Sequence, residues 1–269
     1  RTGGAIYIGI TGPCRTGKST FIRRFMEKAV LPNMTDEYER ERAVDELPLI
    51  GAGKMITTTE PKFVPSRPAE IKAGDNLKFK MRLIDCVGYI VDGAEGTLED
   101  DEPRMVSTPW SSEPMPLAAA ALTGTNKVIN DHSTVAIAMT TDGSITDIPR
   151  ENYVEAEEDI VETLKKSGKP FVMVLNSANP YSPETDSLRT ELEEKYGVPV
   201  KTADCSRLKD EDINELMESL LYEFPVNEIN INIPRWLEGL ENGHWLKSSV
   251  ISTLLSLTEK VSDSSVDIT

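Results

Sequence analysis

The chain has 269 residues, enough for one α/β domain of ordinary size and a smaller module. Its 45 acidic residues outnumber its 29 basic ones, and the resulting net charge of −16 excludes nucleic acid and anionic lipid as favoured partners. The three scattered cysteines and two histidines are typical of reduced cytosolic thiols without a disulfide framework or a histidine metal site, and no apolar run reaches the ~20 residues of a membrane span.

The first predicted elements are a strand over Ala5–Ile10 and a helix that ends near Ala29, before Pro32. Between them lies the pattern G-x-x-x-x-G-K-S, typical of a phosphate-binding loop. Its glycines let successive backbone N–H groups turn onto phosphates, and the following helix N-terminus adds partial positive charge. The candidate nucleotide-binding residues of this loop are Gly12, Arg15, Thr16, Gly17, Lys18, Ser19 and Thr20.

Three side chains of the loop have distinct predicted roles. Lys18 is expected near the β- and γ-phosphates and is the first catalytic candidate. Ser19 offers its hydroxyl to Mg²⁺. The role of Arg15 stays open between a phosphate contact, a contact with a partner and an ordinary solvated arginine.

A hairpin is predicted next, after a charged stretch over 34–54 that shows no clear period. Its strands are Glu60–Ile71 and Leu77–Ile84, separated by an Ala-Gly-Asp-Asn turn. Prolines 61, 65 and 68 place the first strand at the edge of a sheet.

The second strand of this hairpin ends in the pattern D-x-x-G, which begins at Asp85. A carboxylate there can hold the water shell of Mg²⁺, and the N–H of Gly88 can contact the γ-phosphate. Upstream, Thr58 and Thr59 are expected to close over the nucleotide as catalytic residues, with Thr58 also on the metal. Taken without this motif order, the threonine run would indicate only β propensity.

After a long acidic, proline-rich insert over 92–116, strands and helices alternate. This alternation predicts an α/β fold of the P-loop NTPase type, similar to small GTPases, with a mostly parallel sheet, one antiparallel edge strand and helices on both faces. The predicted strands are Ser133–Met139, Phe171–Leu175 and Val198–Thr202, and the helices are Tyr153–Lys166, one from Pro183 to Gly197, and one carrying Ile213, Leu216 and Leu220.

The nucleotide-binding domain is expected to cover residues 1–225. Residues 226–269 are expected to begin a second module that is truncated here. A strand is predicted over 226–233, and a heptad-like apolar stripe indicates a helix over 250–261.

The motif order resembles that of translation-factor-like GTPases, in which the strand before the base-binding loop ends in N-K-x-D. This chain has Asn176, but Ser177 lacks the lysine stem that packs on the base, and Asn179 replaces the acceptor carboxylate. An amide cannot accept two guanine hydrogen bonds without presenting its own donor, so ATP is favoured over GTP. Tyr89 stands where many relatives place a glutamine that orients water, which predicts slow or assisted hydrolysis.

Longer runs carry a closer resemblance, to the stage IV sporulation protein A family of endospore-forming bacteria, over essentially the whole chain. They include GPCRTGKSTFIRRFME, TTEPKFVP, RLIDCVGY, PRMVSTPW, HSTVAIAMTTDG, YVEAEE and YEFPV. The resemblance implies a Mg²⁺-dependent ATPase whose hydrolysis drives polymerisation into the basal layer of the spore coat, on the forespore surface in the mother-cell cytoplasm. It also implies three kinds of partner: copies of the chain itself, other spore coat morphogenetic proteins, and a small forespore membrane anchor peptide.

Two other function classes stay open. A nucleotide-gated scaffold would change conformation on ATP binding alone, with hydrolysis incidental. A GTPase switch with an altered base motif would bind GTP in preference to ATP.

Overall fold

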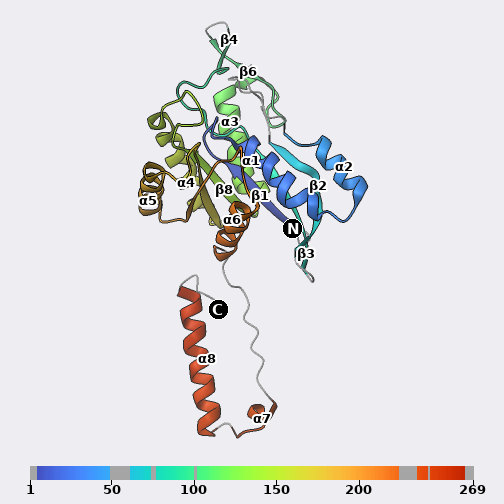
Figure 1. Ribbon diagram of the computed structural model, residues 1–269, viewed down its shortest axis with the longest axis vertical. Helices are drawn as coiled ribbons and strands as arrows, with labels where there is room; N and C mark the ends of the chain where they lie inside the picture. The colour runs from blue at the N-terminus through green and yellow to red at the C-terminus, as the bar shows by residue number, and fades with distance from the viewer. Residues whose placement is uncertain are drawn as a thin grey trace. The chain divides into compact units, whose positions relative to one another are not determined.

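The protein is described by a computed structural model in which the chain divides into two compact units, Arg1–Ser219 and Leu220–Thr269 (Figure 1). Structural statements below concern the residues whose placement is described. These are residues 5–48, 61–73, 77–99, 102–223, 235–241 and 243–263.

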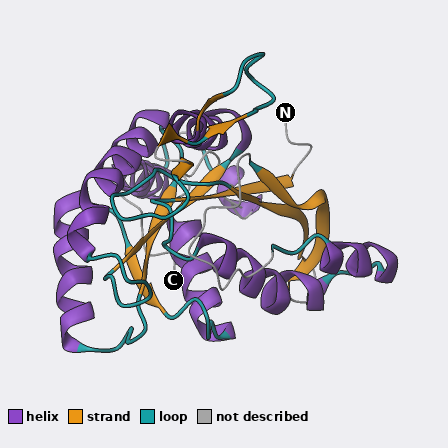
Figure 2. Cartoon of the chain, turned by 90° about the horizontal axis from the view of Figure 1, so that it is seen from above, coloured by secondary structure: helices purple, strands orange, loops and turns teal. Residues whose placement is uncertain are grey.

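The first unit is built on a six-stranded sheet with the order β10-β9-β8-β1-β3-β2 (Figures 1 and 2). All neighbouring strands pair in parallel except β2 and β3, which are antiparallel, and β2 lies at the edge. The predicted sheet with one antiparallel edge strand is therefore confirmed. Its strands are β1 (Ala5–Thr11), β2 (Lys62–Ala73), β3 (Leu77–Asp85), β8 (Val135–Thr141), β9 (Phe171–Asn176) and β10 (Val200–Ala203).

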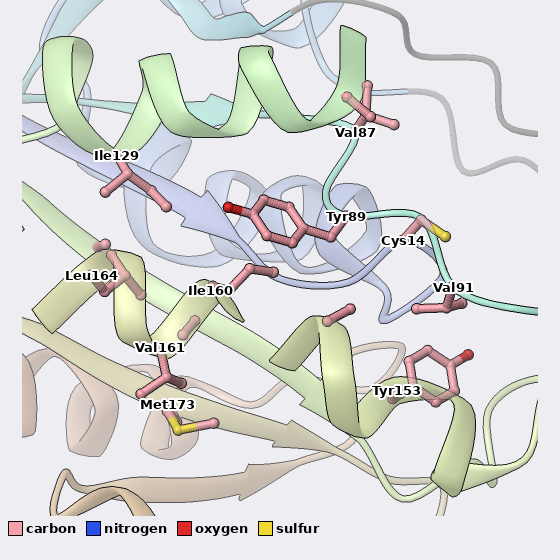
Figure 3. Close-up of a cluster of buried hydrophobic side chains, with 14 of the residues drawn as sticks. Cys14, Val87, Tyr89, Val91, Ile129, Tyr153, Ile160, Val161, Leu164 and Met173 are labelled. Carbon is pink, nitrogen blue, oxygen red and sulfur yellow. The ribbon is translucent and has the colours of Figure 1, made fainter. Parts of the chain in front are cut away.

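Helices cover both faces of this sheet, also as predicted. On one face a buried cluster joins side chains of α3, α4 and α5 to alternate residues of the strands, among them Met173 of β9 (Figure 3). The next residue, Val174, turns to the other face, where it lies with Phe21 of α1 and Leu216 of α6. The helices are α1 (Lys18–Phe25), α3 (Leu117–Lys127), α4 (Val154–Ser167), α5 (Pro183–Tyr196) and α6 (Asp210–Tyr222).

Helices α4 and α5 have capping residues at their ends. Ser182 accepts a hydrogen bond from the backbone N–H of Thr185 and caps α5, whose first residue is a proline. Helices α4 and α5 end at Gly168 and Gly197, both in the left-handed conformation.

Two helices of the first unit lie where none is predicted. Helix α2 (Glu37–Asp45) buries only Ala43, so its sequence shows no apolar period; Asp36 caps it. Helix α3 is rich in small residues and lies directly after the insert. The helical path after the glycine loop also continues slightly beyond its predicted end, through a π-helical turn over Met26–Val30 and a 3-10 turn over Leu31–Asn33.

The insert over 92–116 contains two short antiparallel pairs, β4 (Leu98–Glu99) with β5 (Glu102–Pro103) and β6 (Met105–Val106) with β7 (Met115–Pro116). Val106 is buried in the same core cluster as α3. The insert is therefore joined to the domain at its second hairpin.

The second unit contains α7 (Arg235–Glu238) and α8 (Trp245–Asp263). Helix α8 confirms the predicted helix over 250–261, and Val250 and Leu254 of its stripe are half-buried. The strand predicted over 226–233 lies outside the described residues. Among the described helices, none is both long and apolar enough to cross a membrane.

Candidate functional site

The candidate site lies at the carboxyl edge of the parallel strands, where β1, β3 and β9 end at Thr11, Asp85 and Asn176. Strand β1 stands between β3 and β8, and the chain leaves β1 towards β2 and β3 but leaves the neighbouring β8 in the opposite direction, towards β9. In open α/β sheets ligands bind outside such a switch point. The strand order therefore places the glycine loop at the position where a ligand is expected.

The loop between β1 and α1 requires its glycines for two reasons. Gly12 and Gly17 have φ values of 144° and 88°, which side chains rarely allow. A β-carbon at Gly12 would also lie 2.2 Å from the Met139 carbonyl oxygen, and one at Gly17 would lie 2.4 Å from Nδ2 of Asn176. Helix α1 begins at Lys18, directly after the loop, so its free N–H groups open onto the same space.

Lys18 is 6% exposed and folds back across the loop. Its ammonium group donates to the carbonyl oxygens of Gly12 at 3.2 Å and Pro13 at 2.6 Å. A β-carbon at Gly88 would lie 2.5 Å from Nζ of Lys18, so the glycine of D-x-x-G and the lysine of the loop are neighbours. The structure thus brings together two residues that are 70 positions apart in the sequence.

Asp85 is buried at the end of β3 and faces the start of α1. The Ser19 hydroxyl donates to its Oδ2 at 2.8 Å, whereas its Oδ1 is buried and has no hydrogen-bond partner among the residues that the structure describes. Burial raises the pKa of the Asp85 carboxyl, and the Ser19 hydrogen bond and the Lys18 charge oppose that rise. A buried carboxylate oxygen without a partner is costly, which indicates that the site is built for a further ligand.

The pair of Ser19 and Asp85 fits Mg²⁺ held with a nucleotide. This ion prefers oxygen ligands and binds through one or two protein groups, substrate phosphates and water. Within the described ranges, no group of three or more histidine, cysteine, aspartate or glutamate side chains is placed to hold a metal ion. A Mg²⁺ site that takes its remaining ligands from phosphate oxygens agrees with the Ser19–Asp85 pair and with the lack of a larger cluster of metal ligands within these ranges.

Asn176 holds the glycine loop from the side of β9. Its Nδ2 donates to the Thr16 carbonyl oxygen at 3.0 Å, and its Oδ1 accepts from the Cys205 N–H at 3.0 Å. Thr16 in turn donates to the Pro13 carbonyl oxygen at 2.9 Å. Both ends of the Asn176 amide are therefore used to position loops.

The two departures from the N-K-x-D pattern follow Asn176. The Ser177 hydroxyl is buried and donates to Asp142 at 2.6 Å, so it offers nothing to a base. Asn179 is exposed and, together with Asp204, lines a pocket formed by the loops that follow β9 and β10. Asp142 was missed in the sequence, although it directly follows β8 and so stands at the same edge of the sheet as Asp85, the last residue of β3.

Tyr89 is joined to the glycine loop through its backbone. The Cys14 N–H donates to the Tyr89 carbonyl oxygen at 2.7 Å. The phenol ring points away into the core, and its hydroxyl donates to Asn126 at 2.9 Å (Figure 3). The Cys14 side chain is buried in the same cluster, so the loop is attached to the core at this residue.

The structure thus places Gly12, Lys18, Ser19, Asp85 and Gly88 at one edge of the sheet, with Asn176 behind them. Thr58 and Thr59 lie outside the described residues. Thr20, in the first turn of α1, is half-buried.

A glycine loop between the first strand and first helix, a lysine inside it and a buried aspartate on the neighbouring strand define a P-loop nucleoside triphosphatase. Comparison with known proteins specifies the family. The model of the ATPase domain of stage IV sporulation protein A matches residues 1–225, and that of its middle domain matches residues 226–267.

Relatives agree with this match. The stage IV sporulation protein A of Clostridioides difficile is 56% identical over 254 residues, which cover 94% of this chain and 52% of that protein. Its counterparts in Bacillus subtilis and Bacillus anthracis are 51% and 50% identical, over 93% of this chain and 51% of each protein. The chain belongs to the stage IV sporulation protein A family, carries its ATPase domain, and spans about half the length of these curated relatives.

Proposed function

We propose that this chain binds Mg·ATP at its glycine loop and hydrolyses it, and that hydrolysis drives a conformational change needed for self-assembly. The observation that carries the proposal is the meeting of Lys18 with Gly88, and of Ser19 with Asp85, at the end of β1. A triphosphate in this position lies against backbone N–H groups, an ammonium group and a helix N-terminus at once.

The residues of the site have separate roles in binding the phosphates and the metal ion. The loop amides and Lys18 bind and orient the phosphates, and Ser19 and Asp85 hold Mg²⁺ directly or through water. A bound Mg²⁺ neutralises charge on the phosphate oxygens. We propose that the Gly88 N–H donates to the γ-phosphate, and that Thr58 and Thr59 on the segment before β2 have the same role. Asn176 keeps the loop in place from behind.

The proposal extends to the setting of the reaction. On the strength of the family, the assembled chain forms the basal layer of the spore coat, on the forespore surface in the mother-cell cytoplasm. Its partners there are copies of itself, other spore coat morphogenetic proteins and a small forespore membrane anchor peptide. Residues 1–225 act as the nucleotide-binding domain, and residues from 226 begin the module that follows.

A nucleotide-gated scaffold is the second candidate, and the burial of Tyr89 favours it. Because the ring is held in the core by Asn126, this side chain does not orient an attacking water. A chain with slow turnover can respond to ATP binding alone.

Assembly with a non-hydrolysable ATP analogue separates the two candidates. We expect the chain to bind the analogue but to stay unassembled in sedimentation, whereas ATP and Mg²⁺ give a sedimenting polymer and release phosphate. Equal sedimentation with ATP and with the analogue would establish the scaffold instead.

The base site gives a prediction of its own, because Asn179 is exposed and its replacement leaves the core intact. Asn179→Asp supplies the carboxylate that accepts two hydrogen bonds from guanine, so GTP affinity should rise about tenfold, a typical value for a charged hydrogen bond. Competition of GTP against a fluorescent ATP analogue measures this. Asn130→Asp adds the same charge at another exposed position and should leave the ratio of affinities unchanged; no gain for Asn179→Asp would contradict the assignment of the base site.

A further inference from the structure

A pocket of about 490 Å³ is formed by the loops that follow β9 and β10. Its volume is in the range of small-molecule sites. Asn179, the residue of the proposed base site, lines it from the first loop, and Asp204 lines it from the second. Tyr181 also lines this pocket, and its side chain is 76% exposed, so it offers a flat surface on which a purine ring can stack. The pocket therefore suits a planar aromatic ligand.

Hydrogen bonds join this pocket to the glycine loop. Asn176 donates to the Thr16 carbonyl oxygen at 3.0 Å and accepts from the Cys205 N–H at 3.0 Å. The Ser177 N–H donates to the Ala203 carbonyl oxygen at 3.0 Å, which holds the starts of the two pocket loops together. The walls of the pocket are therefore fixed to each other and to the loop that carries Lys18, so their polar atoms are positioned before a ligand binds.

The two oxygens of the Asp204 carboxylate have different surroundings. Oδ1 accepts from the Ser206 N–H at 2.9 Å and from the Ser206 hydroxyl at 2.6 Å. Among the residues that the structure describes, Oδ2 has no hydrogen-bond partner, and the Arg207 Nε with which it is paired lies 3.9 Å away on a side chain that is 87% exposed. Oδ2 therefore keeps its capacity to accept a hydrogen bond, whereas the Ser206 N–H is already used.

Asp212 lines the same pocket but is engaged differently. Its Oδ2 accepts from the Lys209 N–H at 2.8 Å, at the start of α6. Asp204 directly precedes Cys205, whose N–H is bound by Asn176. Asp204 is therefore the carboxylate of this pocket that the hydrogen bonds attach to the glycine loop.

We propose that Asp204 selects adenine by accepting a hydrogen bond from its exocyclic amino group at Oδ2. This inference rests on the proposed ATPase function and deepens it. Adenine carries an amino donor at the ring position where guanine carries a carbonyl oxygen. A carboxylate oxygen accepts from the amino group and repels the carbonyl oxygen, and the Ser206 N–H, which could donate to a carbonyl oxygen, is held by Oδ1. The loop after β10 thus favours a base with a donor at this position.

The test compares Asp204→Asn with the parent chain in equilibrium binding of three triphosphates. Their purines carry at the same ring position an amino group (ATP), a carbonyl oxygen (inosine triphosphate) or hydrogen (purine riboside triphosphate). The parent should bind ATP about tenfold more tightly than purine riboside triphosphate, and inosine triphosphate more weakly than either. In Asp204→Asn the two Ser206 donors keep the amide oxygen at the place of Oδ1, so the amide NH₂ takes the place of Oδ2. ATP affinity should fall about tenfold, and inosine triphosphate affinity should rise about tenfold.

Asp212→Asn is the matched control, because it removes the same charge from the same pocket and its amide oxygen can still accept from the Lys209 N–H. Its order of affinities should equal that of the parent. A parent chain that binds the three triphosphates within about threefold of one another, or an unchanged order in Asp204→Asn, overturns the inference while the proposed function stands. An equal shift in Asp212→Asn also overturns it, since the preference would then come from the charge of the whole pocket. A parent chain that binds none of the three overturns both.

Discussion

Lys18→Ala is expected to weaken ATP binding by more than 100-fold. The ammonium group is buried beside Gly88 and meets the phosphates as a full charge, and two charge-assisted hydrogen bonds contribute about 1.5–3 kcal/mol each. The measurement is calorimetric titration of the Mg²⁺-loaded variant with ATP. An affinity within tenfold of the parent would show that the glycine loop is not the nucleotide site.

The fold contains a matched control for this experiment. Lys169 also donates to backbone carbonyl oxygens, those of Ile129, Asn130 and Ser133 at 2.6–2.7 Å, but it lies between α4 and β9, at the edge of the sheet where β9 begins. Both substitutions leave carbonyl oxygens without their donor and should lower the melting temperature. Only Lys18→Ala should lose ATP affinity. An equal loss of ATP affinity in Lys169→Ala would mean that destabilisation alone explains the result.

The parts of the fold that could be predicted are those that bury a regular face. Strands β1, β8 and β9 are apolar runs, and α5 carries its serine cap and its terminal glycine in the sequence. Helix α2 could not be predicted because a single alanine of its nine residues is buried, and its charged residues suit a loop equally well. Its position is decided by contact with β2 and the preceding 3-10 turn, which no local pattern reports.

The candidate site likewise contains residues that the sequence could predict and residues that it could not. Residues 12–19 are contiguous, so their spacing alone predicts a phosphate loop, and Asp85 follows from its place at the end of a strand. The direction of the Tyr89 ring depends on Asn126, a residue of another element, and no spacing could reveal it.

Asn176 shows most clearly what could not be predicted from the sequence. The motif order assigns it to a base-binding sequence, but both of its amide atoms hold loops together, one at Thr16 and one at Cys205. Such a residue couples the loop that carries Lys18 to the loop after β10. Base selection then falls to the residues that follow it, which differ here from the GTPase pattern.

Asp85→Asn should separate the function of this carboxylate from its effect on stability. The loss of one charge beside Ser19 should raise the Mg²⁺ concentration for half-maximal turnover by about 10–100-fold, the range found for groups that support a metal site. Titration of phosphate release with Mg²⁺ at saturating ATP measures this. Asp131→Asn removes an exposed charge near the end of α3 and should leave the curve unchanged.

The same substitution should make the metal-free protein more stable. Because burial raises the folded pKa of Asp85 above its ordinary value of 3.8, the stability of the parent falls as pH rises from that value through the folded pKa. An asparagine has no charge to bury, so the variant should melt close to the parent at pH values below 3.8 and at a higher temperature near neutral pH. Melting curves in a chelator across this interval test the sign. A variant that is less stable at neutral pH would mean that the Asp85 carboxylate stabilises the fold. If the variant is instead more stable and needs more Mg²⁺, the carboxylate lowers stability and serves to bind the ligand.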